Sequence, residues 1–292
     1  MNILVIGSSG QLGWELQRSL LPLGTVFSVD FPEIDLSDTS SIQHWVRTTK
    51  PEVIINAAAY TAVDQAEEES DLAWLINSTA PGVLAQEALS AGAMLIHYST
   101  NFVFDGSKGK SYQENDTPNP INVYGESKLG GEREICKVGG EYLIFRTGWL
   151  YSTRRDCFVT KVLHWARTQE VLRIVGDQIG SPTWSRTLAD TTAQAVLMMN
   201  ISTQSWREDK SGIYHLAGNG SVNRYQWAKT ILDLDPRNEE HIFTELQEAK
   251  SREFKTPARR LENSSLNCAL FQDTFNSFYA DWESTLAAAL TI

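Results

Sequence analysis

The chain has 292 residues, with 36 acidic and 25 basic side chains and a formal net charge of −11. No basic run occurs and no apolar stretch approaches the ~20 residues that span a bilayer, so we expect no nucleic-acid and no membrane partner. The first predicted strand begins at residue 2, so we expect no signal peptide, and the three separated cysteines (Cys136, Cys157 and Cys268) suggest reduced thiols. We therefore expect a cytoplasmic protein without a metal site.

A glycine-rich turn lies between the first predicted strand and the first predicted helix. Asn2–Ile6 is a continuous apolar run, which indicates a strand buried on both faces. Leucines at helical spacing then predict a helix from Gln11 to about Leu21. This order is typical of a dinucleotide site, where backbone N–H groups and a helix N-terminus face the pyrophosphate; the alternative is an ordinary turn. The residues predicted to bind the cofactor here are Gly7, Ser9, Gly10, Gln11, Leu12 and Gly13.

An acid follows the second predicted strand, Val26–Val29. Asp30 lies about 20 residues after the glycine turn, where a carboxylate binds the adenosine ribose and repels a 2′-phosphate. No arginine adjoins Asp30, so the residues favour NADH over NADPH, although aspartate is also common in turns. Asp35 and Leu36 are predicted to flank the adenine.

Small side chains follow the third predicted strand, Val53–Ile55. Small residues at a strand end suit close approach of the cofactor, but tight packing of a helix on the sheet explains them equally well. The cofactor-binding candidates in this segment are Ala57, Ala58, Ala59 and Thr61.

Strands and helices alternate through the first half of the chain. This alternation predicts an α/β fold with a doubly wound parallel sheet, a Rossmann domain. The remaining predicted elements of this half are the helices Thr39–Thr49, Asp71–Ala91 and Tyr124–Lys137 and the strands Met94–Tyr98 and Tyr142–Phe145.

The alternation loosens after Trp149, which indicates a smaller α/β C-terminal substrate domain. We predict a dinucleotide-binding domain over residues 1–150, with returning elements near 186–218. The substrate-binding domain then comprises residues 151–185 and 219–292.

A tyrosine and a lysine lie four residues apart at the start of a predicted helix. This spacing places Tyr124 and Lys128 on one helical face. An ammonium beside a phenol favours the phenolate and so lowers the pKa of the tyrosine from its usual ~10, which allows proton exchange near neutral pH. The pair follows the glycine turn and Ser99–Thr100 at a strand end, and this order of features indicates one catalytic site.

Five segments resemble those of one enzyme family: NAAAYTAVD at 56–64, HYSTNFVFDG at 97–106, NVYGESK at 122–128, FRTGWLY at 145–151 and DQIGSPT at 177–183. The family is the dTDP-4-dehydrorhamnose reductases, which are extended short-chain dehydrogenases. The resemblance covers nearly the whole chain. It implies that NADPH or NADH reduces the C4 ketone of a dTDP-4-keto-6-deoxy sugar, dTDP-4-dehydro-6-deoxy-L-mannose, to dTDP-L-rhamnose.

The resemblance also implies residue roles. Tyr124 matches the proton donor to the ketone oxygen, and Lys128 matches the residue that tunes this tyrosine and holds the nicotinamide ribose. Thr100 matches a hydroxyl that binds the carbonyl oxygen as negative charge develops. Trp149 matches an aromatic residue that packs against the sugar. Arg260 is a candidate phosphate contact, although a solvated surface charge explains it as well.

Two substrate-binding candidates depart from the family pattern. Members commonly read S-T-D-Y-V-F where residues 99–104 read STNFVF, so Asn101 loses a charge and Phe102 loses a hydroxyl. Some members also dimerise through magnesium held by acidic side chains. Arg186 occupies the helix where one such acid is expected, so we predict no metal site and leave monomer and homodimer open.

Two other functions fit the same fold. Asn101 and Phe102 favour another nucleotide-sugar 4-ketoreductase or an epimerase. A non-catalytic regulatory subunit, like the one that acts with methionine adenosyltransferase, also resembles this family. The presence of Thr100, Tyr124 and Lys128 argues against a non-catalytic role.

Overall fold

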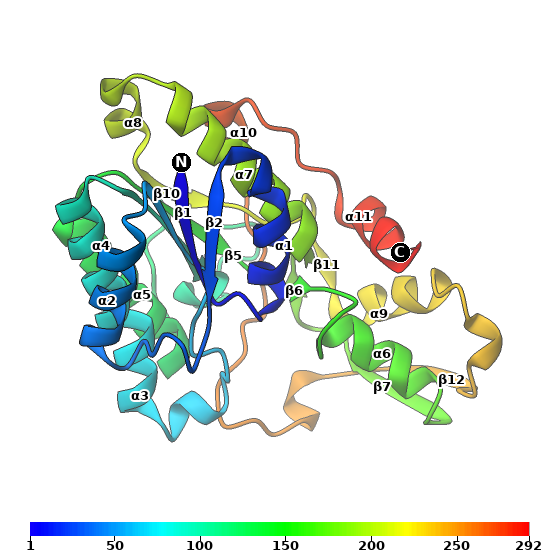
Figure 1. The fold of residues 1–292 in the computed structure, drawn as a ribbon. Coiled ribbons are helices and arrows are strands. Elements are labelled where there is room, and N and C mark those ends of the chain that lie inside the picture. The colour runs from blue at the N-terminus through cyan, green and yellow to red at the C-terminus, as the bar shows by residue number, and fades with distance from the viewer. Residues whose placement is uncertain (292) are drawn as a thin grey trace.

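The computed structural model describes residues 1–291, and a parallel sheet lies at its centre (Figure 1). Its six strands run in the order β10-β5-β4-β3-β1-β2, with every neighbouring pair parallel. This confirms the doubly wound fold predicted from the alternation of strands and helices. The strands are β1 (Asn2–Ile6), β2 (Thr25–Val29), β3 (Val53–Asn56), β4 (Met94–Thr100), β5 (Tyr142–Thr147) and β10 (Gly212–His215).

Helices cover both faces of the sheet because its strands are apolar on both sides. In β1, Ile3 and Val5 face one apolar core while Leu4 and Ile6 face another, and all four side chains are fully buried. Each such burial contributes about 1.5–3 kcal/mol. The first face packs against α1 (Gln11–Ser19), α7 (Ser185–Ile201) and α10 (Ala269–Phe275), and the second against α2 (Thr39–Thr49), α4 (Ala80–Ala91) and α5 (Val123–Val138) (Figure 1).

The helix predicted over Asp71–Ala91 is interrupted. α3 (Ser70–Trp74) leads into a π-helical turn at Leu75–Thr79 before α4 begins. Within this turn the side chain of Asn77 accepts a hydrogen bond from Tyr60 N (2.9 Å) and donates one to Tyr60 O (3.0 Å). The amide of Asn77 thus fixes the segment that follows β3, a tertiary contact that helical periodicity does not report.

The second half of the chain builds a separate apolar core around Trp227, whose ring stacks on Trp149 and Phe158. α7 and β10 instead lie with the large sheet, since α7 packs against α1 and β10 pairs with β5. The predicted domain boundaries stay a prediction. The other elements are β6 (Leu150–Tyr151), α6 (Phe158–Ala166), β7 (Val171–Val175), β8 (Ile179–Gly180), β9 (Thr183–Trp184), α8 (Gln204–Lys210), β11 (Val222–Asn223), α9 (Arg224–Asp233), β12 (Glu245–Ala249) and α11 (Trp282–Thr291).

None of the helices described over residues 1–291 is both long and apolar enough to cross a bilayer. Strands β1 to β5 are parallel to one another, so their carboxyl ends lie along the same edge of the sheet. Ligands of doubly wound sheets bind at this edge.

Candidate active site

A cavity of about 730 Å³ opens at the carboxyl ends of β1 to β5. Each of these strands contributes its last residue or the residues that follow it, so segments far apart in the chain share one wall. The predicted site residues on this wall are Gly7, Ser9, Gly10, Gln11, Leu12, Asp30, Ala57, Ala58, Ala59, Thr61, Thr100, Asn101, Phe102, Tyr124, Lys128, Trp149 and Arg260.

Three predicted cofactor residues do not line the cavity. Gly13 lies behind it, and a Cβ there would meet Gly7 O at 2.0 Å, so this glycine permits the contact of α1 with the turn. The carboxylate of Asp35 accepts hydrogen bonds from Ser37 N (2.8 Å) and Ser37 Oγ (2.7 Å). Leu36 is buried in the apolar core between the sheet and helices α2, α4 and α5. A role for Asp35 and Leu36 beside the adenine stays a prediction.

The glycine turn brings the backbone to the cavity at a point where a side chain on Gly7 would clash. Gly7 has φ +89°, and a Cβ on it would lie 2.7 Å from Ala58 N. Gln11 contributes a buried Oε1 that has no hydrogen-bond partner among residues 1–291. A turn of this shape at the start of α1 fits the pyrophosphate of a dinucleotide, which backbone N–H groups and the helix N-terminus would bind.

Asp30 holds the glycine turn in place. Its Oδ2 accepts hydrogen bonds from Ser9 N (2.8 Å) and Ser9 Oγ (2.5 Å), and its Oδ1 accepts one from Phe31 N (2.9 Å). Each carboxylate oxygen offers two lone pairs, so Oδ1 retains capacity to accept a further bond. The acid therefore belongs to the turn and to the cavity wall at the same time.

Lys128 is a buried residue of the cavity wall, and its ammonium group is held by β4. Its Nζ donates to Tyr98 O (2.6 Å) and lies 3.2 Å from Nε2 of His97. Burial lowers the pKa of Lys128 to about 8, and the nearby carboxylate of Glu132 opposes this shift.

The phenol of Tyr124 differs from the sequence-based expectation. Burial raises the pKa of Tyr124 above its usual value, while interaction with the Thr100 hydroxyl lowers it by a smaller amount. Burial of the phenol thus outweighs the lowering that was expected from Lys128, whose Nζ lies against Tyr98 O and His97. Helical spacing placed the two residues on one face, but it did not reveal the contacts of Lys128 with Tyr98 O and the His97 ring on β4.

A buried ion pair joins the middle of α5 to β5. Arg146 of β5 donates two hydrogen bonds to Glu132 (2.9 and 2.6 Å), and Ser99 Oγ donates to the same carboxylate. Both charged side chains are at most 3% exposed. Asn122 caps the helix by accepting a hydrogen bond from Gly125 N (2.8 Å). These contacts fix Thr100 and Tyr124 relative to each other, because Ser99 and Asn122 are close neighbours of these two residues in the chain.

Trp149 is held in an uncommon conformation at the cavity wall. Its φ of +48° is unfavourable for a bulky side chain, and the surrounding contacts stabilise it. The ring stacks on Trp227 (5.3 Å between centroids), and a Cβ on Gly180 would fall 2.2 Å from it. The guanidinium of Arg224 lies 3.9 Å from the ring centroid of Trp149.

The two residues that depart from the family pattern, Asn101 and Phe102, both contact neighbouring residues in the structure. Asn101 is buried and its Nδ2 donates to Ser264 O (3.0 Å), a contact that an aspartate at this position could not make. The ring of Phe102 packs edge-on against Tyr124, with 5.5 Å between centroids.

Positive charge gathers in the cavity although the chain is acidic. Arg224 lies outside every sequence motif discussed above, and it forms no ion pair within residues 1–291. Burial lowers its pKa to about 9, and Arg260 adds to the shift. Arg260 also pairs with Asp64 (2.6 Å). Sequence analysis missed Arg224 because the pairing of β11 with β8 brings it to the wall. The charged residues on the wall are Lys128, Arg155, Arg224 and Arg260 against Asp30 and Asp156.

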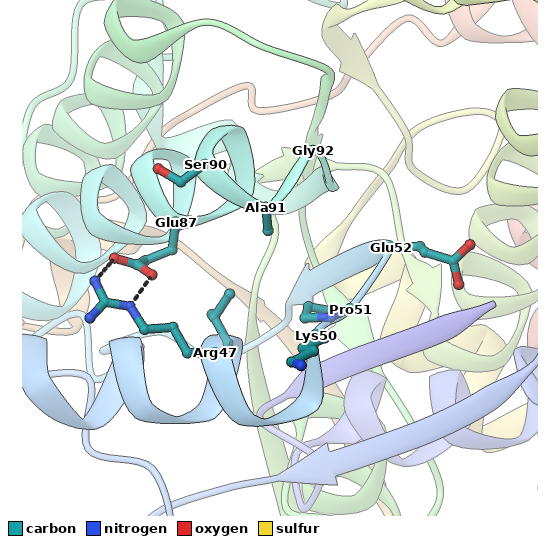
Figure 2. A pocket seen from close by; sticks show the side chains of 9 residues that line it. Arg47, Lys50, Pro51, Glu52, Glu87, Ser90, Ala91 and Gly92 are labelled. Carbon is teal, nitrogen blue, oxygen red and sulfur yellow. Dashed lines mark hydrogen bonds and ion pairs between the residues drawn. The ribbon is translucent and has the colours of Figure 1, made fainter.

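Another hollow, of about 430 Å³, lies near the amino ends of β3 and β4, at the edge of the sheet away from this site (Figure 2). Two of its charged groups pair with each other, since Arg47 donates two hydrogen bonds to Glu87 (2.9 and 2.7 Å), and none of the predicted site residues lines it. We therefore assign the active site to the larger cavity. No cluster of metal ligands occurs among residues 1–291.

The doubly wound sheet, the glycine turn after β1 and the tyrosine–lysine pair on α5 define the fold of a short-chain dehydrogenase/reductase. Over residues 1–292 the chain matches the model of the RmlD substrate binding domain family, and it belongs to this family.

Named relatives agree with this assignment. The dTDP-4-dehydrorhamnose reductase of Escherichia coli K12 is 38% identical over 289 residues, which cover 97% of this chain and 95% of the relative. A crystal structure of a dTDP-4-dehydrorhamnose reductase from Clostridium acetobutylicum has a TM-score of 0.89 and 32% identity, covering 100% of this chain and 99% of that one. The Bacillus anthracis enzyme, solved in complex with NADP, has a TM-score of 0.86 and 31% identity, covering 99% and 98%. These matches confirm the oxidoreductase family expected from the sequence segments.

Replacing Glu132 with alanine should destabilise the protein by about 3–5 kcal/mol, because it leaves Arg146 buried without its partner. Urea unfolding measures the change. The matched control is Glu134→Ala on the same helix, where the ion pair with Lys137 is exposed and should contribute less than about 1 kcal/mol. Equal losses in the two variants would contradict the role of the buried pair.

Proposed function

We propose that this chain reduces the C4 ketone of dTDP-4-dehydro-6-deoxy-L-mannose to dTDP-L-rhamnose with NADPH or NADH. The observation that carries the proposal is that Thr100, Tyr124 and Lys128 line the same cavity as the glycine turn. The named relatives, at 38% identity over nearly the full chain, support the choice of substrate.

The proposed chemistry divides between cofactor and protein. When bound, the nicotinamide supplies a hydride to the ketone carbon. Tyr124 gives its phenolic proton to the ketone oxygen, so hydride and proton together convert the ketone to an alcohol. Thr100 donates a hydrogen bond to the same oxygen as negative charge develops there. The Lys128 ammonium stabilises the phenolate that remains, and solvent returns the proton.

The charges on the cavity wall suit the other end of the substrate. A nucleotide sugar carries a diphosphate, and Arg224 and Arg260 offer two guanidinium groups that can bind its oxygens. Because Asp64 already neutralises Arg260 in part, Arg224 is the stronger candidate. Trp149 presents an apolar ring beside Arg224, against which a sugar ring can pack.

No observation favours a second function over this one. The amide at Asn101 is explained by its bond to Ser264 O, and Phe102 retains the ring that packs on Tyr124. These two departures therefore need no different sugar and no loss of catalysis.

Tyr124→Phe should reduce kcat by about 10²–10⁴-fold, because general acid catalysis contributes that much. Binding of NADPH, followed by its fluorescence, should be nearly unchanged. Tyr142→Phe is the control, since that hydroxyl lies outside the cavity and its one hydrogen bond within residues 1–291 is to the Cys136 thiol (3.6 Å). A Tyr124→Phe enzyme that keeps half of its activity would remove Tyr124 from the mechanism.

Asp30→Asn should shift the ratio of kcat/KM for NADPH over NADH upward by about tenfold. The wild-type carboxylate repels a 2′-phosphate, and two unit charges ~4 Å apart interact by about 1 kcal/mol in water and by more beside protein. The amide oxygen can still accept the hydrogen bonds from Ser9 N and Ser9 Oγ that hold the glycine turn, and only the bond from Phe31 N is lost. Asp38→Asn at the N-cap of α2 controls for the loss of a charge elsewhere, and an unchanged ratio for Asp30→Asn would argue against ribose binding by Asp30.

Arg224→Met should raise KM for the sugar nucleotide by about 10–100-fold with little change in kcat, since a hydrogen bond to a charged group contributes about 1.5–3 kcal/mol. Methionine keeps an apolar stem against Trp149. Calorimetry with dTDP alone should show the same weakening. Arg173→Met, which removes an exposed ion pair with Glu253, is the control; if both variants bind dTDP like the wild type, Arg224 does not contact the diphosphate.

A further inference from the structure

A chain of three buried polar side chains runs from the wall of the cavity into the protein. Asn56 at the end of β3, His97 in β4 and Lys128 in α5 are each at most 1% exposed. Nδ2 of Asn56 lies 3.2 Å from Nδ1 of His97, and Nε2 of His97 lies 3.2 Å from Nζ of Lys128. We propose that His97 is the positioning residue of Lys128 and that Asn56 fixes the tautomer of the His97 ring. The proposal rests on the function proposed above for Lys128.

The contact of Asn56 with Ala58 at the cavity wall determines which groups donate and which accept along the chain of side chains. Ala58 N donates to Oδ1 of Asn56 (3.2 Å), so the amide nitrogen of Asn56 is the group that faces His97. An amide nitrogen only donates, and Nδ1 of His97 must therefore accept. A neutral imidazole with an accepting Nδ1 carries its proton on Nε2, the atom that faces Lys128.

The ring is neutral for a clear physical reason. Burial and the adjacent Lys128 hold the pKa of His97 well below its usual value. With the proton on Nε2, the ring offers the lysine a donor. An amine can accept that bond and still donate to Tyr98 O, whereas an ammonium has no lone pair to accept it. This tautomer therefore opposes the charged form of Lys128, in the same direction as burial does.

The other groups around Lys128 oppose this effect or lack charge. On its own helix, Glu132 favours the ammonium but is already paired with Arg146 of β5. Tyr124 lies one turn away on the same helix, and the uncharged side chain of Asn77 in the π-helical turn donates to Ser127 Oγ (3.1 Å). The His97 ring is thus the titratable group in hydrogen-bond contact with Nζ among the described residues.

This arrangement has a consequence for the proposed reaction. The ammonium form of Lys128 stabilises the phenolate of Tyr124, and that form is lost as pH rises through the pKa of Lys128, about 8. Turnover should therefore fall on the alkaline side at a pH that His97 and Asn56 help to set. Asn56 also connects the pKa of Lys128 to the cavity wall near the glycine turn, because the same amide accepts a hydrogen bond from Ala58 N.

The first test reads the ring directly. ¹⁵N NMR of the intact protein with labelled histidine distinguishes a protonated Nε2 from a protonated Nδ1, with His97 assigned by its loss in His97→Gln. The proposal requires a neutral ring protonated on Nε2. A ring protonated on Nδ1, or on both nitrogens, at neutral pH overturns it, whether or not any variant folds.

The second test changes the tautomer. In Asn56→Asp the carboxylate accepts from Nδ1–H, so Nε2 becomes an acceptor for Lys128. The pKa of Lys128, followed by NMR with labelled lysine and assigned with Lys128→Met, should rise from about 8 toward its usual 10.5. Asn223→Asp, at the N-cap of α9, introduces the same charge without contact to Lys128 and should leave that pKa unchanged.

The third test measures the pH dependence of kcat. The alkaline limb of kcat should move upward with the pKa of Lys128 in Asn56→Asp and stay in place in Asn223→Asp. A folded Asn56→Asp enzyme with an unchanged Lys128 pKa and an unchanged limb overturns the proposal. If the wild-type chain turns over no keto sugar, the proposed function fails, and the two NMR tests still decide the role of His97.

Discussion

The hydrogen bond from Lys128 to the carbonyl of Tyr98 fixes the geometry on which the whole site depends. It joins α5 to β4 in the interior, where an unpaired ammonium would be costly. α5 can approach so closely because of its glycines: a Cβ on Gly125 would meet Phe102 O at 2.2 Å, and one on Gly131 would meet Asn77 O at 2.2 Å. With the helix seated in this way, Tyr124 and Thr100 lie on the same cavity wall.

The distribution of charge follows a second constraint. An acidic chain with a net charge of −11 places Lys128, Arg155, Arg224 and Arg260 around a single cavity. Local positive charge in a concave site attracts anions and concentrates them there, even when the protein as a whole repels them. The negative net charge and an anionic dinucleotide or sugar nucleotide are therefore compatible, because the interaction is local and the net charge is spread over the surface.

The sequence predicts the parts of this structure that depend on local patterns. Apolar runs identify β1 to β5, and glycine spacing identifies the turn after β1, because both features act over a few neighbouring residues. The sequence could not predict the π-helical turn, which depends on the bond between Asn77 and Tyr60, nor Arg224, which pairing of distant short strands brings to the cavity. The sequence also could not predict the raised pKa of Tyr124, since this shift depends on burial of the phenol in the folded chain.

The central claim is that the chain is a stereospecific 4-ketoreductase of a sugar nucleotide. The most direct test incubates the purified protein with dTDP-4-dehydro-6-deoxy-L-mannose and NADPH, and then with NADH, and identifies the product by NMR. The account predicts one equivalent of oxidised cofactor per sugar and dTDP-L-rhamnose as the single product. No cofactor oxidation with either nucleotide, or a product with the opposite configuration at C4, would contradict it.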